Sequence, residues 1–252
     1  MRAKIRPVTP ASRQIAENLA RIRERIAVAA ARAGRRPEGI TLVAVSKTHP
    51  AEKIRELYEA GVRHFGENRV QEREAKSAQL ADLDITWHMI GHLQKNKAAR
   101  AAGLFDVIDS VDSVAIGEKL NQARNPLATE PSNRSFSTSR LGVLIEVKLD
   151  PEPAKSGAAP DEARRITEAI LRLPCLDLRG LMGVPPYFDD PEQARPYFRR
   201  LRELREALTA HLGADPLAVL SMGMSHDFEV AIEEGATQVR IGTALFGERP
   251  KK

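Results

Sequence analysis

The stretch that decides the fold is residues 40–50, which read Ile-Thr-Leu-Val-Ala-Val-Ser-Lys-Thr-His-Pro. Residues 40–45 form a nearly continuous β-branched and apolar run, which is typical of a parallel strand that is covered on both faces. Lys47 follows where the chain must turn, and Pro50 is suited to open the next helix. An amine at the carboxyl end of a buried parallel strand lies where α/β proteins place their chemistry. Taken alone, the pattern also fits a lysine whose ammonium group simply reaches solvent.

Seven more short apolar segments follow, and helical spacing separates nearly all of them. The predicted strands are residues 40–45, 62–68, 85–90, 105–108, 141–147, 176–184, 217–220 and 238–241. The predicted helices are residues 10–34, 51–61, 70–80, 94–100, 114–123, 161–173 and 191–212, with a last one ending at Gly235. This alternation favours a single closed (β/α)8 TIM-like barrel with an additional N-terminal helix over an open doubly wound sheet. The sequence has no Gly-x-Gly-x-x-Gly after the first strand and no Walker-type phosphate loop.

Residues 1–9 and 124–140 are expected to lie outside the packed barrel. The first is a loose extension, because the additional helix begins at Pro10, where Thr9 is a suitable cap. The second is rich in Asn, Pro, Ser and Thr and has almost nothing to bury, so we expect a flexible surface loop without chemistry. The barrel domain would then span residues 10–249.

Composition excludes several classes of protein. The chain is 42% hydrophobic and 29% charged, and it has no apolar run long enough to cross a bilayer. Cys175 is the single cysteine, so internal disulfides are impossible and a reducing, cytoplasmic location fits best. The net charge of +5 comes from the Arg-rich first 36 residues, and aromatic residues are only 4% of the chain. We therefore expect neither a membrane nor a nucleic acid as partner.

Polar residues follow the ends of the predicted strands. They are Lys47, Asn68, His88, Asp109, Ser221, Arg240 and Thr243. The carboxyl ends of all strands meet on one face of a closed barrel, so these side chains are expected to converge. The segments at 221–225 and 240–243 combine glycines with hydroxyls after strands seven and eight, where this fold recurrently binds phosphate. The glycines also suit tight turns and Ser225 also suits a helix cap, but the two segments together predict a phosphorylated ligand.

A phosphate pocket on the same rim as Lys47 suggests a phosphorylated aldehyde that is held as an imine. Imine formation needs an uncharged amine, and desolvation at a strand tip lowers the pKa of a lysine. Pyridoxal 5′-phosphate (PLP) meets both requirements. Arg240 would reach its ring nitrogen or its phosphate, and Asn68 its ring hydroxyl or the imine side.

Six motifs closely resemble those of the pyridoxal phosphate homeostasis family of the YggS/PROSC type. They lie at residues 44–48, 65–68, 87–97, 179–182, 221–225 and 239–243. The resemblance covers residues 12–249, and that family is similar to the barrel domain of fold-type III alanine racemases. It implies a PLP-binding domain with Lys47 as the covalently modified lysine and with Ser221, Gly242 and Thr243 as phosphate ligands. Asn68, Met222 and Arg240 complete the expected cofactor-binding residues, and client apoenzymes are candidate partners.

The resemblance implies a role in vitamin B6 and amino-acid homeostasis rather than catalysis. Racemases of this type need a second base, a tyrosine from another domain of a partner subunit, and no tyrosine here has a suitable context. Arg240 at the ring nitrogen would also weaken the carbanion sink on which PLP chemistry relies. We expect a non-catalytic PLP carrier, either a monomer or a weak dimer, without a metal.

Two alternatives remain open at the level of the sequence. One is a PLP-dependent amino-acid racemase or lyase of fold type III, with His88 or His49 as the second base. The other is a barrel aldolase that uses Lys47 and no bound aldehyde. His64 is expected to be a surface group.

Overall fold

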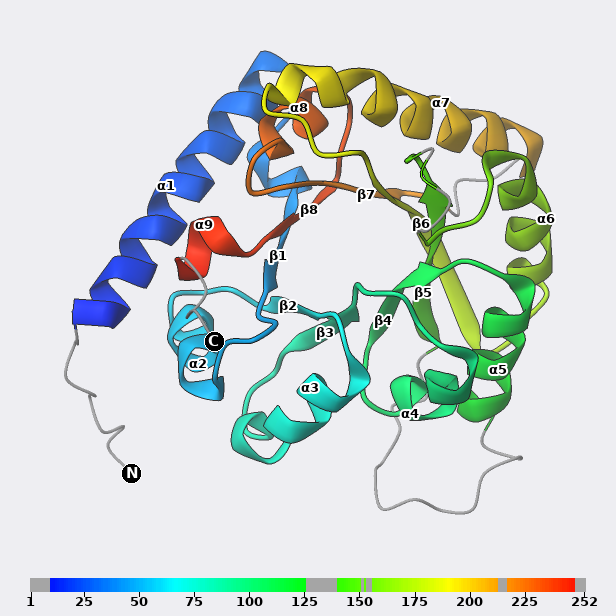
Figure 1. Cartoon of the computed structure of the whole chain (residues 1–252), viewed down its shortest axis with the longest axis horizontal. Coiled ribbons are helices and arrows are strands. Elements are labelled where there is room, and N and C mark those ends of the chain that lie inside the picture. Colours follow the sequence, from blue (N-terminus) through cyan, green and yellow to red (C-terminus); the bar gives the residue numbers. More distant parts are fainter. Residues whose placement is uncertain (1–9, 126–139, 151, 153–155, 213–216, 248–252) are drawn as a thin grey trace.

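A computed structural model describes residues 10–125, 140–150, 152, 156–212 and 217–247. The expected extension at residues 1–9 and most of the expected loop at 124–140 lie outside these residues. Eight parallel strands close into a barrel in the order β1 to β8, and helices surround the ring of strands (Figure 1). The predicted (β/α)8 barrel is therefore confirmed.

The bounds of the elements agree with the predicted segments to within a few residues, with the exceptions described below. The strands are β1 (Thr41–Val45), β2 (His64–Glu67), β3 (Thr86–Met89), β4 (Val107–Val111), β5 (Leu141–Lys148), β6 (Leu176–Val184), β7 (Val219–Met224) and β8 (Gln238–Ile241). The α-helices are α1 (Pro10–Arg32), α2 (Ala51–Glu59), α3 (Val70–Lys76), α4 (Ala98–Ala102), α5 (Val114–Arg124), α6 (Pro160–Leu171), α7 (Arg195–Leu212), α8 (Phe228–Glu233) and α9 (Thr243–Phe246). Short 3-10 helices lie at Pro37–Gly39, Ala78–Leu80, Lys95–Lys97 and Pro191–Ala194.

β1 has hydrogen-bonded neighbours on both sides. Val43 pairs with His64 of β2 and with Arg240 of β8. Paired residues share a face of the sheet and successive residues alternate between faces. Val43 and Val45 therefore point into the barrel, on the same face as His64 and Arg240, whereas Ala44 points toward the helices. Both faces are covered, which explains the uninterrupted apolar run of the sequence.

Two strands extend further than the sequence predicts. The apolar pattern ends the fourth strand at residue 108 and the seventh at residue 220, whereas β4 continues to Val111 and β7 to Met224. Asp109 and Ser221 consequently lie inside strands instead of at their tips. Both side chains are fully buried, and Gln238 donates hydrogen bonds to both. Hydrogen bonds inside the barrel thus stabilise β4 and β7 beyond the residues at which the apolar pattern predicts their ends.

The end of β7 is irregular at Gly223. The register with β8 shifts between Ser221 and Met224, and Gly223 has a φ of 90°. A Cβ at this position would lie 2.6 Å from the Cβ of Ala231. Only glycine fits this close approach of β7 to α8. The short helix α9, which follows β8 directly, was also not predicted.

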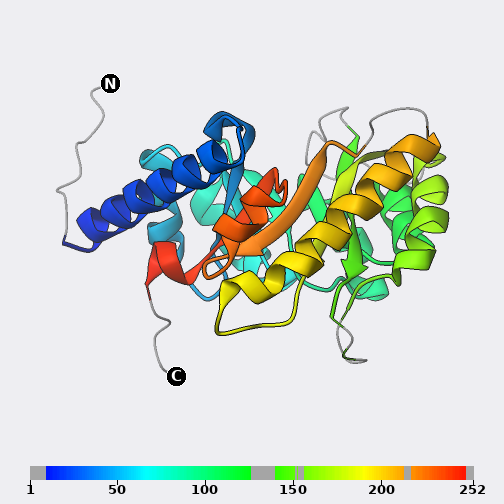
Figure 2. The ribbon, with the colours of Figure 1, turned by 90° about the horizontal axis from the view of Figure 1, so that it is seen from above.

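The additional helix α1 packs along the outside of the barrel, beside α8 and α9 (Figures 1 and 2). Its apolar stripe of Ile15, Leu19, Ile22 and Ile26 is buried, as the helical spacing predicts. The side chain of Asn18 donates a hydrogen bond of 2.9 Å to the carbonyl oxygen of Leu245 in α9. α1 is therefore hydrogen-bonded to α9, the helix that follows β8.

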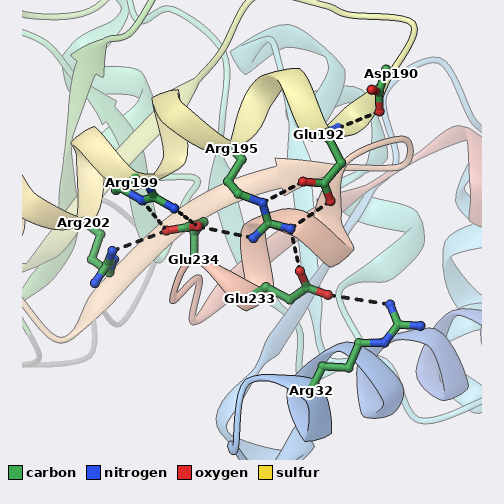
Figure 3. Close-up of polar contacts among 8 residues, drawn as sticks. All are labelled: Arg32, Asp190, Glu192, Arg195, Arg199, Arg202, Glu233 and Glu234. Atoms are coloured by element: carbon green, nitrogen blue, oxygen red, sulfur yellow. Dashed lines mark hydrogen bonds and ion pairs between the residues drawn. The ribbon is translucent and has the colours of Figure 1, made fainter.

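An ion-pair cluster joins the outer helices α7, α8 and α1 (Figure 3). Its members are Arg32, Glu192, Arg195, Arg199, Arg202, Glu233 and Glu234. Arg195 of α7 lies 2.6 Å from Glu233 and 3.2 Å from Glu234, and Arg32 of α1 reaches Glu233 at 3.6 Å. Burial disfavours the charge of Glu234, yet hydrogen bonds from Arg199 and Arg195 lower the pKa of this carboxyl.

Candidate functional site

Lys47 lies just beyond the carboxyl end of β1. Together with Thr48 it forms a turn. The backbone N–H of Ser46 donates to the carbonyl oxygen of Gly66 in β2 at 3.0 Å, so the ends of β1 and β2 are joined just before the lysine. Thr48 has a φ of 67°. A β-branched residue in the left-handed region is strained, and such strain gathers at functional sites. Lys47 is therefore held in a turn whose conformation the surrounding residues impose.

Three side chains fix the backbone of this turn; we call Ser46, Glu67 and Lys76 the turn clamp. The ammonium group of Lys76 donates to the carbonyl oxygen of Ser46 at 2.9 Å and to the carboxylate of Glu67 at 2.6 Å. The hydroxyl of Ser46 donates to the same carboxylate oxygen at 2.7 Å. Burial raises the pKa of Glu67, and the Lys76 ammonium works against that rise. The clamp was not predicted, although a charged residue inside the short apolar strand β2 is a visible signal.

Asn68 follows β2 and closely contacts the end of β3. A Cβ added at Gly91 would lie 2.4 Å from the carbonyl oxygen of Asn68, so the two strand ends approach as closely as glycine allows. A groove of about 610 Å³ opens beside Asn68, and its other lining residues include Arg69, His92 and Lys97. Asn68 thus stands at the edge of an open part of the barrel mouth that has both polar and apolar lining residues.

Gly242 and Thr243 lie at the end of β8, next to β1. A Cβ added at Gly242 would lie 3.4 Å from the Cβ of Val45, two residues before Lys47. Thr243 is exposed and begins α9. The backbone N–H groups of Gly242 and Ala244 donate long hydrogen bonds of 3.3 and 3.4 Å to the hydroxyl of Ser225. The structure therefore brings the predicted phosphate residues of β8 onto the same rim as Lys47.

Ser221 and Arg240 lie deeper than the rim, inside the barrel. Arg240 is 4% exposed and donates to the hydroxyl of Ser221 at 2.6 Å and to the carbonyl oxygen of Gly183 at 3.0 Å. Burial lowers the pKa of Arg240, and the negative charges of Asp109 and Glu146 oppose this effect. Met222, which alternates with Ser221 along β7, is fully buried in the apolar core. The structure thus groups Ser221 with Arg240 and separates Met222 from them.

A second buried carboxyl, that of Glu146, shares the barrel interior. Glu146 pairs with Met182 of β6, which pairs with Ser221, so Glu146 and Ser221 share the inner face. The hydroxyl of Ser156 donates to one carboxylate oxygen at 2.9 Å, and the other oxygen is buried with no partner among the described residues. Burial raises the pKa of this carboxyl. In a ring of eight strands β5 stands opposite β1, so Glu146 lies across the barrel from the strand that carries Lys47.

The histidines do not lie where the sequence suggests. His64 was expected at the surface, and this prediction is wrong: its ring is partly buried and its Nδ1 lies 3.0 Å from Nε2 of His88. Burial and the neighbouring His88 lower the pKa of His64 to about 4. His88 lies inside β3, with its Nδ1 2.9 Å from Asp109. His49 is buried and stacks on Phe246 of α9 at 4.4 Å.

In the described part of the chain, no group of three or more His, Cys, Asp or Glu residues could hold a metal ion. No helix among the described residues is both long and apolar enough to span a membrane.

Comparisons with known proteins place this chain in a family. The family model "alanine racemase, N-terminal domain" matches residues 18–250. The pyridoxal phosphate homeostasis protein of Aquifex aeolicus is 48% identical over 234 residues, covering 92% of this chain and 97% of that protein. Its counterpart in Pseudomonas aeruginosa is 46% identical over 235 residues, covering 93% and 96%.

A solved structure shows the same relationship in three dimensions. PipY of Synechococcus elongatus, in its structure with PLP bound, is 40% identical, covers 92% of this chain and 100% of that chain, and superposes with a TM-score of 0.79. Relatives with this level of identity over nearly the whole length of both chains are members of one protein family. The chain therefore belongs to the pyridoxal phosphate homeostasis proteins, within the alanine racemase N-terminal domain family.

Proposed function

We propose that this chain binds PLP at the carboxyl mouth of the barrel, holds it covalently on Lys47 as an imine, and serves vitamin B6 and amino-acid homeostasis without catalysing a reaction. The observation that carries the proposal is the adjacency of two strand ends: Lys47 follows β1, and Gly242 at the end of β8 packs against Val45 of β1. An amine and a backbone suited to an oxyanion thus share one rim. The relative PipY, whose structure contains PLP, has this fold.

The residues present fit the cofactor. The backbone N–H groups of Gly242 and Ala244 make only long bonds to Ser225, so they remain good donors for a phosphate. Arg240 uses two of its five N–H groups on Ser221 and Gly183, which leaves donors for a ligand. When bound, PLP supplies the aldehyde with which the lysine amine combines.

Each residue of the site has a distinct task in this proposal. The turn clamp orients the backbone that carries Lys47. Gly242, Thr243 and Ser221, with the backbone around Met222, line the phosphate end. Arg240 faces the ring nitrogen and Asn68 the ring hydroxyl. Residues 10–249 form the PLP-binding domain, which acts in the cytoplasm as a monomer or weak dimer and delivers PLP to client apoenzymes.

The positions of the histidines support a carrier over a racemase or lyase. Both ring nitrogens of His88 are engaged, one with Asp109 and one with His64, and His49 is stacked on Phe246. A histidine with both ring nitrogens engaged, as in His88, is poorly suited to serve as a free second base. Incubation of the PLP-loaded protein with L-alanine in deuterated water is expected to give no more α-proton exchange than free PLP gives. Exchange at a clearly higher rate would instead support a racemase.

Titration with PLP tests the binding proposal. We expect the wild-type protein to stay yellow after unbound PLP has been removed by gel filtration and the Lys47→Met variant to lose this absorption. Lys53→Met is a matched control, because Lys53 lies on α2 and donates only a 3.5 Å bond to the carbonyl oxygen of Phe246. Full colour in a folded Lys47→Met variant would refute the assignment, and a colourless wild type would favour the aldolase alternative.

A further inference from the structure

A continuous chain of polar side chains crosses the interior of the barrel and ends on Arg240; we call it the interior relay. Its members are His64, His88, Asp109, Gln238, Ser221 and Arg240, and they come from β2, β3, β4, β8 and β7. Consecutive members are 3.0, 2.9, 2.6, 2.9 and 2.6 Å apart. β4 and β8 are not neighbours in the barrel, so the contact between Gln238 and Asp109 passes through its interior. The relay therefore spans the inside of the barrel rather than its wall.

Hydrogen-bond chemistry fixes the direction of the contacts that run from His88 through Asp109 to Arg240. A carboxylate only accepts, so Asp109 requires a proton on Nδ1 of His88 and a donor from Gln238. The contact between Nδ1 of His64 and Nε2 of His88 extends the chain by one ring, and its direction depends on which of the two nitrogens carries the proton. The amide nitrogen of Gln238 gives one hydrogen to Asp109 and the other to Ser221. One arrangement of protons thus satisfies every link from His88 to Arg240.

The relay also connects two buried opposite charges that do not touch. A guanidinium as buried as that of Arg240 needs a nearby negative charge, because an uncompensated buried ion is costly. Asp109, which is fully buried, is the strongest of the negative groups that act on Arg240; the others are Glu146 and Asp227. Gln238 and Ser221 form the hydrogen-bonded bridge between Asp109 and Arg240. Buried polar networks of this kind rigidify a site only when every member is satisfied.

We propose that Gln238, Asp109 and His88 are positioning residues, which act through Ser221 to fix the place and charge of Arg240 against the ring of bound PLP. This inference rests on the proposed function. In the proposed site only Arg240 and Ser221 of the relay would contact the cofactor, so its influence would appear in the electronic state of the ring. A purely structural relay would affect the stability of the barrel and leave the spectrum of bound PLP unchanged.

Two substitutions separate these roles. Gln238→Met keeps the length of the side chain and removes both donors, and Asp109→Asn keeps the shape and removes the charge. We expect each to shift the absorption maximum of bound PLP and to weaken PLP binding about tenfold, because Arg240 would be held less firmly against the ring. Thr167→Val is the matched control, because the Thr167 hydroxyl is equally buried but bonds to Ala163 in the outer helix α6. It should leave spectrum and affinity unchanged.

A double-mutant cycle shows whether the relay acts through Arg240. Arg240→Lys is expected to shift the spectrum, and Gln238→Met added to it should change little more, since residues of one network are not additive. Folded Gln238→Met and Asp109→Asn proteins with wild-type spectrum and affinity would overturn the inference, and so would additive shifts. If Gln238→Met does not fold, the spectrum and PLP affinity of Asp109→Asn, alone and combined with Arg240→Lys, test the inference. If the wild type itself fails to bind PLP, the proposed function fails instead.

Discussion

At the scale of single residues, the turn clamp decides how Lys47 is presented. Glu67 is fully buried, and Lys76 is the cation that compensates it. Removing one partner of a buried ion pair leaves an uncompensated charge and costs about 3 kcal/mol or more. We predict that Lys76→Met lowers the free energy of unfolding in urea by about 3 kcal/mol and weakens PLP binding, because the carbonyl oxygen of Ser46 loses one of its two donors and keeps only the backbone N–H of His49.

The double variant Lys76→Met/Glu67→Gln provides the control. It removes both charges, so most of the lost stability should return, whereas PLP binding should stay weakened. A Lys76→Met protein as stable as the wild type would show that the pair does not matter for the turn.

Gly242 offers a test of the phosphate end that does not disturb the fold. A Cβ at this position would meet its nearest neighbour, in Val45, at 3.4 Å, an ordinary contact. We therefore predict that Gly242→Ala keeps the wild-type melting temperature but weakens PLP binding about tenfold, because an added methyl group would crowd a phosphate bound against the backbone of Gly242. Gly39→Ala, where a Cβ meets nothing within 4 Å, is the matched control. An unchanged affinity of Gly242→Ala for PLP would show that the phosphate does not bind against Gly242.

His64 makes the stability of the barrel depend on pH. Burial lowers the pKa of His64 to about 4 in the folded chain, from the 6.5 of an unperturbed histidine. Between these values only the unfolded chain takes up the proton, so this contribution to stability is present above pH 6.5 and is lost as the pH falls toward 4. The groups that act on its ring are His88, Asp109 and Arg179. We predict that the melting temperature of His64→Gln falls less than that of the wild type over this range; parallel curves would contradict the prediction.

At the scale of the elements, the ion-pair cluster of Figure 3 ties α7 to α8. Glu234 receives hydrogen bonds from Arg195, Arg199 and Arg202. Because solvent screens these arginines in part, we predict that Glu234→Gln costs only about 1 kcal/mol of stability, and less at high salt. Glu168→Gln is the control: its partners Arg164 and His211 are exposed, and we expect no measurable change. An equal loss in both variants would mean that the cluster adds nothing to isolated pairs.

The limits of prediction also appear at the scale of the elements. The apolar run of residues 40–45 identified β1, since a strand covered on both faces has little choice of residues. The same criterion ended β4 and β7 too early, because Asp109 and Ser221 are polar yet point into the barrel. Hydrogen bonds with Gln238 offset their burial, and a contact between residues 129 positions apart leaves no trace in local periodicity.

At the scale of the whole molecule, closure of the barrel accounts for the part of the site that the sequence predicts. Lys47, Asn68 and Gly242 follow strand ends, and in a closed parallel barrel all strand ends meet, so their convergence could be inferred without coordinates. The interior relay and the turn clamp could not. They depend on which side chains face inward and on the length of Lys76 and Gln238, which only the packed structure determines.

The central claim is that Lys47, and no other amine at the mouth, carries the cofactor. Reduction of the PLP-loaded protein with borohydride followed by peptide mapping tests it most directly. The account predicts that the label lies on Lys47 alone and that no label is retained by Lys47→Met. Stoichiometric label on Lys76, Lys53 or Lys97 in the wild-type protein would contradict it.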